Sequence, residues 1–275
     1  MFSTGHLIWI GICLVLIVGG FIACQRIKPP VRKILKVCLA LGALSEVVKI
    51  FSVIQILPMV EPAIVMGESG AQLTYAATGQ YTPYLEMSHL PLELCSLMIV
   101  FIAAALLVKS ELWQKRILTL MYITGTVGGT LGILLAYITT DFTTTVEYFN
   151  SFRVWQYFLY HAMVVTLGLY MGFRQDSGVS LKSLKSTLAL LVVLDIPTFY
   201  LNSVFSQPVY TAEKPSGVLY RANFFSSYVN PLGLVLTQKW QWMVYLGIRL
   251  AIAVTISSLL LWLAGKSQQR RRGSR

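Results

Sequence analysis

The amino-acid sequence predicts an all-α integral membrane protein, a seven-transmembrane helix bundle with its N-terminus outside and its C-terminus in the cytoplasm. Three observations predict it: the composition, the lengths of the apolar stretches and the distribution of charge. Of the 275 residues, 56% are hydrophobic and only 12% are charged, whereas about a quarter of the residues in a soluble domain are charged. The composition therefore excludes a soluble globular enzyme and a disordered chain.

Seven apolar stretches are each long enough to cross a bilayer, which takes about 20 mainly apolar residues. They cover residues 7–25, 36–57, 90–108, 116–138, 153–173, 184–205 and 241–264. No basic residue precedes the first stretch, so we interpret it as a span rather than a signal peptide. Because no Pro-rich or Gly-rich linker divides the chain, we expect a single seven-helix membrane domain over residues 1–275, with outer loops at 58–89 and 206–240 and a basic tail at 265–275.

The basic residues lie mainly on one side of the predicted membrane. The segments after spans one, three and five, together with the C-terminal tail, hold 16 Lys and Arg residues against two acidic residues. The loops on the other side hold four basic and six acidic residues. The positive-inside rule places the basic segments in the cytoplasm. The net charge of +11 therefore predicts orientation, and contact of the tail with anionic lipid at the cytoplasmic face, rather than nucleic-acid binding.

Span four contains the sequence GTVGGTLG, in which Gly125 and Gly129, and likewise Gly128 and Gly132, are four residues apart. Small residues at this spacing let two helices approach closely. We favour packing inside the bundle over a dimer interface, and the sequence leaves the oligomeric state open.

A small set of polar side chains lies within the predicted spans. An ionisable group there is costly unless it is paired or faces an aqueous cavity, so each one is a candidate for function. The set consists of Glu46, Lys49, Glu93, Cys95, His161, Asp195, Asn202 and Arg249. Glu46 and Lys49 are three apart on one helix face, which suits either a structural ion pair or part of a site.

Cys95 and His161 are predicted to lie at similar depths. Spans three and five both enter from outside, and a helix rises about 1.5 Å per residue, which places Cys95 about 8 Å and His161 about 12 Å below the outer ends. An imidazole can take a thiol proton and so activate a nucleophile. The alternatives are a Cys buried as a small hydrophobe and a His bonded to helix backbone. The Cys and His spacings do not suit zinc, and we expect no metal and no cofactor.

Three stretches of the sequence, in this order, match motifs of a known family. They are HLPLELCSL at 89–97, WQYFLYHAMVVTLGLYMGF at 155–173 and RANFFSSYVNPLG at 221–233. On these motifs the chain resembles the YwaF-like integral membrane proteins, a family that includes an animal transmembrane acyltransferase acting on ether phospholipids. The resemblance implies that Cys95 forms an acyl thioester, that His161 is essential and that Asn223 matches the family Asn. This chain has Glu93 where many bacterial members have His.

The leading hypothesis is a membrane lipid acyltransferase or acyl hydrolase in which His161 deprotonates Cys95. Its substrate would be a membrane phospholipid or lysophospholipid, and its location a bacterial plasma membrane. Other polar residues would stabilise the oxyanion, orient His161 or line the site. These residues are Glu93, Asp195, Asn202, Asn223 and Arg249.

Two other classes of protein stay open. A transporter or small-ligand receptor would use the intramembrane charges of Glu46, Lys49, Asp195 and Arg249 to bind a polar solute or relay protons. A purely structural membrane protein would tolerate substitutions throughout this polar layer. Blocking Cys95 with a thiol reagent distinguishes the enzyme from the transporter.

Overall fold

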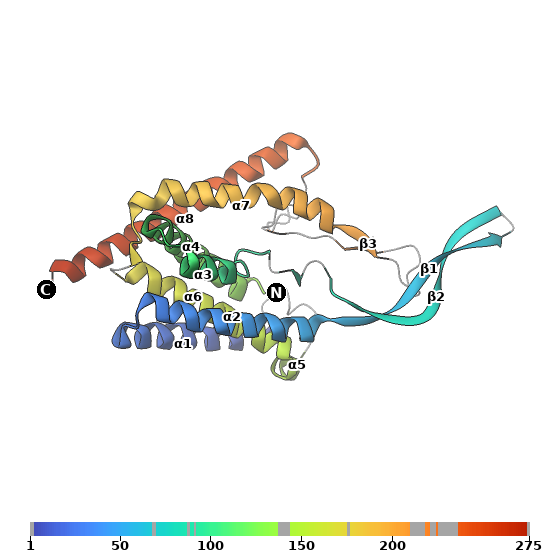
Figure 1. Cartoon of the computed structure of the whole chain (residues 1–275), viewed down its shortest axis with the longest axis horizontal. Coiled ribbons are helices and arrows are strands. Elements are labelled where there is room, and N and C mark those ends of the chain that lie inside the picture. The colour runs from blue at the N-terminus through green and yellow to red at the C-terminus, as the bar shows by residue number, and fades with distance from the viewer. Residues whose placement is uncertain are drawn as a thin grey trace. The chain divides into compact units, whose positions relative to one another are not determined.

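The structure, a computed structural model, is mainly helical (Figure 1). It describes residues 3–67, 70–86, 89–90, 92–136, 144–174, 177–209, 218–220, 224 and 236–273. The α-helices are α1 (Thr4–Ile27), α2 (Val31–Val53), α3 (Met98–Leu107), α4 (Glu111–Leu134), α5 (Thr145–Asn150), α6 (Phe152–Phe173), α7 (Leu184–Phe205) and α8 (Lys239–Gly273). A short 3-10 helix, η4 (Leu181–Ser183), precedes α7. The antiparallel strand pairs are β1 (Gln55–Gly67) with β2 (Gly70–Tyr84), and β3 (Gln207–Val209) with β4 (Val218–Tyr220).

A helix occupies at least part of each of the seven predicted spans, and the short α5 is additional. In the part of the chain that the structure describes, four helical segments are long and apolar enough to cross a membrane. They are Thr4–Ile27, Glu111–Leu134, Leu181–Phe205 and Lys239–Arg270. α2 and α6 are of similar length but less apolar, α2 with five charged residues and α6 with Arg153, Gln156 and His161, and α3 is apolar but has only 10 residues. The protein is therefore a mainly helical membrane protein.

The start of span three differs from the prediction. The prediction begins the helix at residue 90, whereas α3 begins at Met98 and residues 94–97 form turns. The Met98 N–H donates to the Cys95 carbonyl (3.2 Å), and the Ile99 N–H donates to the Ser96 carbonyl (3.2 Å). These bonds join residues three apart, which tightens the chain compared with an α-helix. Cys95 therefore lies on a tight turn before α3 rather than within the helix.

The segment predicted as the first outer loop contains a long β-hairpin. α2 ends at Val53, short of the predicted residue 57, because the backbone from Gln55 onward pairs with β2, Gln55 facing Tyr84. The register shifts between Pro58 and Val60. A proline has no N–H to donate to the hydrogen bonds between strands, so it is tolerated where that side of the strand faces no partner.

Contacts divide the chain into two compact units, which are described separately. The first contains residues 1–49, 92–194 and 234–275, and the second contains residues 50–91 and 195–233. In the first unit α4 packs closely on α6 because glycines line the contact. A Cβ added to Gly125 would lie 3.0 Å from the Val164 carbonyl oxygen, and one added to Gly168 would lie 2.8 Å from the Thr126 nitrogen. The glycines of span four thus serve packing inside the bundle.

Candidate functional site

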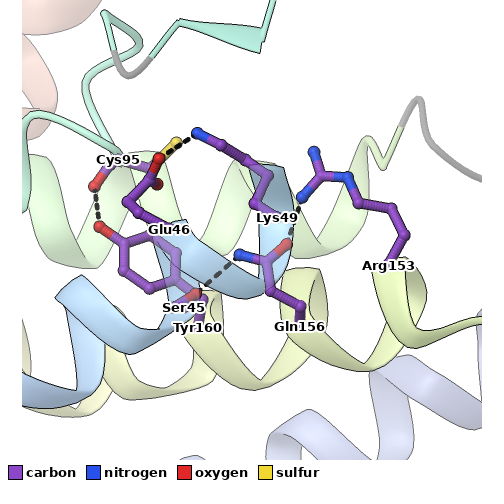
Figure 2. Close-up of polar contacts among 7 residues, drawn as sticks. All are labelled: Ser45, Glu46, Lys49, Cys95, Arg153, Gln156 and Tyr160. Carbon is purple, nitrogen blue, oxygen red and sulfur yellow. Dashed lines mark hydrogen bonds and ion pairs between the residues drawn. The ribbon is translucent and has the colours of Figure 1, made fainter. Parts of the chain in front are cut away.

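Cys95 is held by its backbone against α6. The Tyr160 hydroxyl donates a hydrogen bond of 2.8 Å to the Cys95 carbonyl (Figure 2). The neighbouring Leu94 approaches α4, where a Cβ added to Gly128 would lie 3.9 Å from the Leu94 Cβ. Cys95 is a free, partly buried cysteine. The tight turn that carries the thiol thus lies against α6 and approaches α4.

His161 is a buried imidazole with one ring nitrogen engaged. Its Nδ1 lies 2.7 Å from the Tyr157 carbonyl oxygen, one turn earlier on α6. A carbonyl only accepts hydrogen bonds, so Nδ1 must carry the hydrogen and Nε2 must carry the lone pair of the neutral ring. Nε2 is buried and has no hydrogen-bond partner among the described residues. The ring is therefore oriented as a base with its basic nitrogen unused.

A glycine on α4 makes room for this imidazole. A Cβ added to Gly132 would lie 2.5 Å from His161 Nε2 and would also overlap the ring carbon Cδ2, so the imidazole would have to move. Tyr157 packs against the same ring, with centroids 4.1 Å apart, and its hydroxyl donates to the Gly132 carbonyl (2.9 Å). His161 can thus occupy this position because residue 132 is a glycine and has no side chain.

The structure brings the Cys95 turn and His161 to the same stretch of α4 and α6. Tyr160, which holds the Cys95 carbonyl, directly precedes His161, and their rings meet edge to face at 5.7 Å. Leu94 and His161 face Gly128 and Gly132, which are one helical turn apart. Both proposed catalytic residues are described, and no hydrogen bond joins the thiol to the imidazole. The Cys95 turn and the His161 ring thus lie along the same stretch of α4 and α6.

Polar residues of α2 and α6 form a connected cluster beside Cys95, as Figure 2 shows. Gln156 donates to Ser45 Oγ on α2 (2.7 Å) and accepts from the Arg153 guanidinium. Glu46 and Lys49, one turn apart on α2, form an ion pair. The Gln156 amide thereby links the two helices at the level of the ion pair.

Charges in this cluster act on one another across short distances. Arg153 lies within electrostatic range of Glu46 and Cys95. Its guanidinium also lies over the Tyr157 ring, 5.7 Å from the centroid. Tyr157 in turn interacts electrostatically with Glu93. Titratable groups of both signs, Arg153 and Glu93 among them, therefore act on Cys95.

The remaining predicted site residues lie elsewhere or outside the described residues. The Asn202 amide is buried in the second unit and bonds the Phe224 backbone twice, from Nδ2 to the carbonyl (3.1 Å) and from the Phe224 N–H to Oδ1 (2.7 Å). Asp195, also in that unit, accepts from the Thr198 hydroxyl through its carbonyl (2.6 Å). Arg249 is partly buried on α8. Asn223 lies outside the described residues.

Glu93 stands in the same turn as Cys95, where its carbonyl accepts from the Leu97 N–H (2.8 Å). Within the described ranges, no group of three or more His, Cys, Asp or Glu residues is placed to hold a metal ion. The reactive groups that the site holds include the Cys95 thiol, the His161 imidazole, the Arg153 guanidinium and the Glu93 carboxylate.

Several residues of this cluster were not predicted from the sequence. Arg153 is one of the four basic residues that the charge count assigns to the outer loops, because it stands at the first position of its predicted span. A usable signal is present nonetheless: Arg153, Gln156, Tyr157 and Tyr160 follow the spacing that puts side chains on one face of a helix. Ser45 has no such signal, because a serine in an apolar helix is commonplace.

Comparison with known proteins gives one family. The family model described as the TMEM164 family matches residues 1–262 of the chain. No curated protein and no solved structure matches it.

Proposed function

Since the chain belongs to the TMEM164 family of transmembrane proteins, we propose that it is a membrane enzyme that transfers or hydrolyses a fatty acyl group of a phospholipid or lysophospholipid. Cys95 is the nucleophile and forms an acyl thioester, and His161 is the base. The motif resemblance to the YwaF-like proteins supports the same two roles. The family match by itself establishes a membrane protein.

One observation carries the proposal: the unbonded, buried Nε2 of His161, on the part of α6 where Tyr160 holds the Cys95 turn. A buried polar atom without a partner is costly, by about 1–3 kcal/mol, and native structures rarely leave one without a reason. The Tyr157 carbonyl fixes the ring so that Nε2 carries the lone pair. A structural histidine would gain stability by bonding through both nitrogens, whereas a base needs one nitrogen free for the thiol proton.

The proposed reaction has two balanced steps. Nε2 removes the Cys95 proton, directly or through one water, and the thiolate attacks the ester carbonyl carbon. A C–S bond forms, the C–O bond to the glycerol breaks, and the imidazolium gives its proton to the leaving lysolipid oxygen. A lysolipid hydroxyl or a water, deprotonated by Nε2, then attacks the thioester, a C–O bond forms, and the thiolate leaves and is reprotonated.

The surroundings supply the other roles. Tyr157 orients His161 through its carbonyl, a role that the sequence suggested for Glu93 or Asp195. Backbone N–H groups of the Cys95 turn, Asn223 or Arg249 stabilise the oxyanion of the intermediate. The lipid-exposed surfaces of the helices accommodate the acyl chain.

The proposed arrangement in the membrane has seven spans, with the N-terminus outside. The helices that coincide with the predicted spans and the 16 basic residues on one side support it. In this orientation the Cys95 turn lies in the outer half of the membrane, and the location is a bacterial plasma membrane.

The test is to replace Cys95 with Ala and, separately, His161 with Ala, and to compare cellular lysolipid and phospholipid profiles at matched protein levels. Cys24→Ala, which removes another partly buried free cysteine on α1, is the matched control. We expect acyl turnover to fall at least about 100-fold in both site variants, the scale of a lost general base or nucleophile, and to stay unchanged in the control. Unchanged lipid profiles in the Cys95 variant would refute the proposal.

The transporter alternative makes the opposite prediction for a thiol reagent. Glu46 and Lys49, two of the four charges it would use, neutralise each other. Alkylation of Cys95 abolishes activity of an acyl-thioester enzyme, whereas solute uptake through the charged residues would survive it.

A further inference from the structure

We propose that Arg153 binds the phosphate of the lipid substrate, so that the enzyme selects phosphate-bearing glycerolipids over neutral ones. This inference rests on the proposed function and names the substrate class of the same site. The observation that carries it is a half-buried guanidinium with neutral contacts, beside the proposed base.

Arg153 lacks a carboxylate partner within ion-pair distance among the described residues. Its contacts are the Gln156 side-chain oxygen and the face of the Tyr157 ring. The acidic residue that acts on it is Glu46, whose carboxylate is already paired with Lys49. Arg153, Lys49 and Glu46 together carry one positive charge in excess, and the carboxylate of Glu93 acts on Tyr157 and Cys95 rather than on Arg153.

An anionic ligand resolves this excess. A cation withdrawn from water without a partner is destabilising, and the cost is offset when a charged group binds it with good geometry. A guanidinium presents five N–H donors in a planar fork that matches a phosphate with two parallel hydrogen bonds. The bond to Gln156 leaves most of these donors for a ligand, and the partial exposure of Arg153 leaves a route to them.

The position of Arg153 relative to His161 suits a glycerophospholipid. Both side chains contact the Tyr157 ring, the guanidinium at 5.7 Å and the imidazole at 4.1 Å from its centroid. The distance between the Arg153 guanidinium carbon and the centre of the His161 ring therefore cannot exceed the sum of these two distances. In a glycerophospholipid only a few bonds separate the phosphate from an acyl ester. One molecule can thus place its phosphate on Arg153 and its ester carbonyl beside Cys95 and His161.

Gln156 is the positioning residue for Arg153. Its side-chain oxygen accepts from the guanidinium while its nitrogen donates to Ser45 on α2, which fixes the amide between two helices. The arginine side chain thereby lies along α6 in the direction of His161.

Lipid binding is the direct test, measured by native mass spectrometry on the full-length protein with Cys95→Ala to prevent turnover. The probes are dioleoylphosphatidylcholine and dioleoylglycerol, which differ in the phosphate headgroup. We expect Arg153→Gln to weaken phosphatidylcholine binding at least about 10-fold, as for loss of a charged hydrogen-bond pair, and to leave dioleoylglycerol binding unchanged. Arg153→Lys should recover part of the loss, and Arg26→Gln, at the cytoplasmic end of α1, should change neither.

Three outcomes overturn the inference. Unchanged phosphatidylcholine binding in Arg153→Gln removes the phosphate contact, and equal loss of both lipids makes the role of Arg153 structural. Inorganic phosphate that displaces phosphatidylcholine at the concentration where the lipid itself half-saturates would mark a free-anion site instead of a lipid site. Because binding is measured without turnover, a failure of the thioester mechanism does not obscure any of these results.

Discussion

Helices α1 and α6 belong to the same unit and pack against each other, yet they differ in polarity and in the number of buried residues. α1 has 24 residues, no charge before Arg26 and only four buried residues. α6 has 22 residues, carries Arg153, Gln156 and His161, and buries thirteen residues. The more polar helix is thus the more buried one. In a bilayer the apolar surface faces lipid, and the polar groups need protein partners.

The same contrast separates α4 from the helices at the surface. In the most apolar 18-residue stretch of α4, 56% of the residues are buried. The corresponding share is 11% for α1 and 11% for the segment that ends with α7. α4 and α6 therefore form the interior of the first unit, and the proposed site lies where they meet the Cys95 turn. We therefore look for function on the most buried helices of this unit, α4 and α6.

The largest expected effect compares the two faces of α1. Trp9 is fully buried, stacked on Phe158 at 5.2 Å and edge-on to Trp155 at 4.7 Å, whereas Val15 is 72% exposed. We expect Trp9→Ala to lower the free energy of unfolding by about 3–5 kcal/mol. Val15→Ala should change it by less than about 0.5 kcal/mol. Equilibrium unfolding in mixed micelles checks both, and similar losses would contradict the assignment of α1's exposed face to lipid.

A smaller effect is expected where α4 meets His161. Gly132→Ala forces a methyl group onto the imidazole, which should cost about 1–3 kcal/mol of stability and displace Nε2, so that acyl turnover is lost. Gly128→Ala adds the same methyl group on the same helix, where the nearest atom is 3.9 Å away. Equilibrium unfolding and acyl turnover are measured for both variants, and we expect a loss in Gly132→Ala alone. An active Gly132→Ala variant would argue against a catalytic His161.

The Tyr160 contact offers a still smaller effect. Tyr160→Phe removes the hydrogen bond to the Cys95 carbonyl, which should cost about 1 kcal/mol and loosen the turn. We expect faster alkylation of Cys95 by iodoacetamide, followed by peptide mass spectrometry. Tyr200→Phe, at an exposed position of α7, is the control and should react as the unmodified protein does. Equal alkylation rates would mean that Tyr160 does not hold the turn.

The smallest expected effect lies at the far end of α6 and α8. A groove of about 560 Å³ is lined there by Phe173, Trp262, Leu263, Lys266, Ser267 and Arg270, with Lys266 Nζ 3.9 Å from the centroid of the Trp262 ring. We propose that it holds anionic lipid at the cytoplasmic face. Lys266→Gln should weaken phosphatidylglycerol retention by about 1 kcal/mol and leave phosphatidylcholine retention unchanged, as native mass spectrometry can measure. Equal retention of phosphatidylglycerol would contradict this.

The positions of the helices could be predicted from the sequence, and the details that make the site could not. Long apolar stretches locate a spanning helix because burial in lipid depends on composition alone. The late start of α3 depends on where the Cys95 and Ser96 carbonyls bond, and the hairpin of β1 and β2 depends on pairing between residues far apart. Neither leaves a periodic signal in hydropathy.

The residues of the candidate site likewise divide into those that the sequence predicts and those that it does not. Glu46 and Lys49 are neighbours on one helix, so their pairing was open to prediction from spacing. Arg153 was assigned to an outer loop because charge counting treats the end of a span as solvent. The twofold bond of Asn202 to Phe224 depends on a contact between residues 22 positions apart. Sequence reasoning thus found local pairs and missed the partners that only folding brings together.

The most direct test of the central claim is to look for the acyl-enzyme itself. The purified protein is incubated with phosphatidylcholine carrying a deuterated acyl chain, quenched in acid and digested, and the peptide containing Cys95 is weighed by mass spectrometry. The account predicts the labelled acyl mass on Cys95, removable by hydroxylamine and absent in His161→Ala. Labelled lysolipid or fatty acid formed at the normal rate by Cys95→Ala, or an unlabelled Cys95 in the unmodified protein, would contradict it.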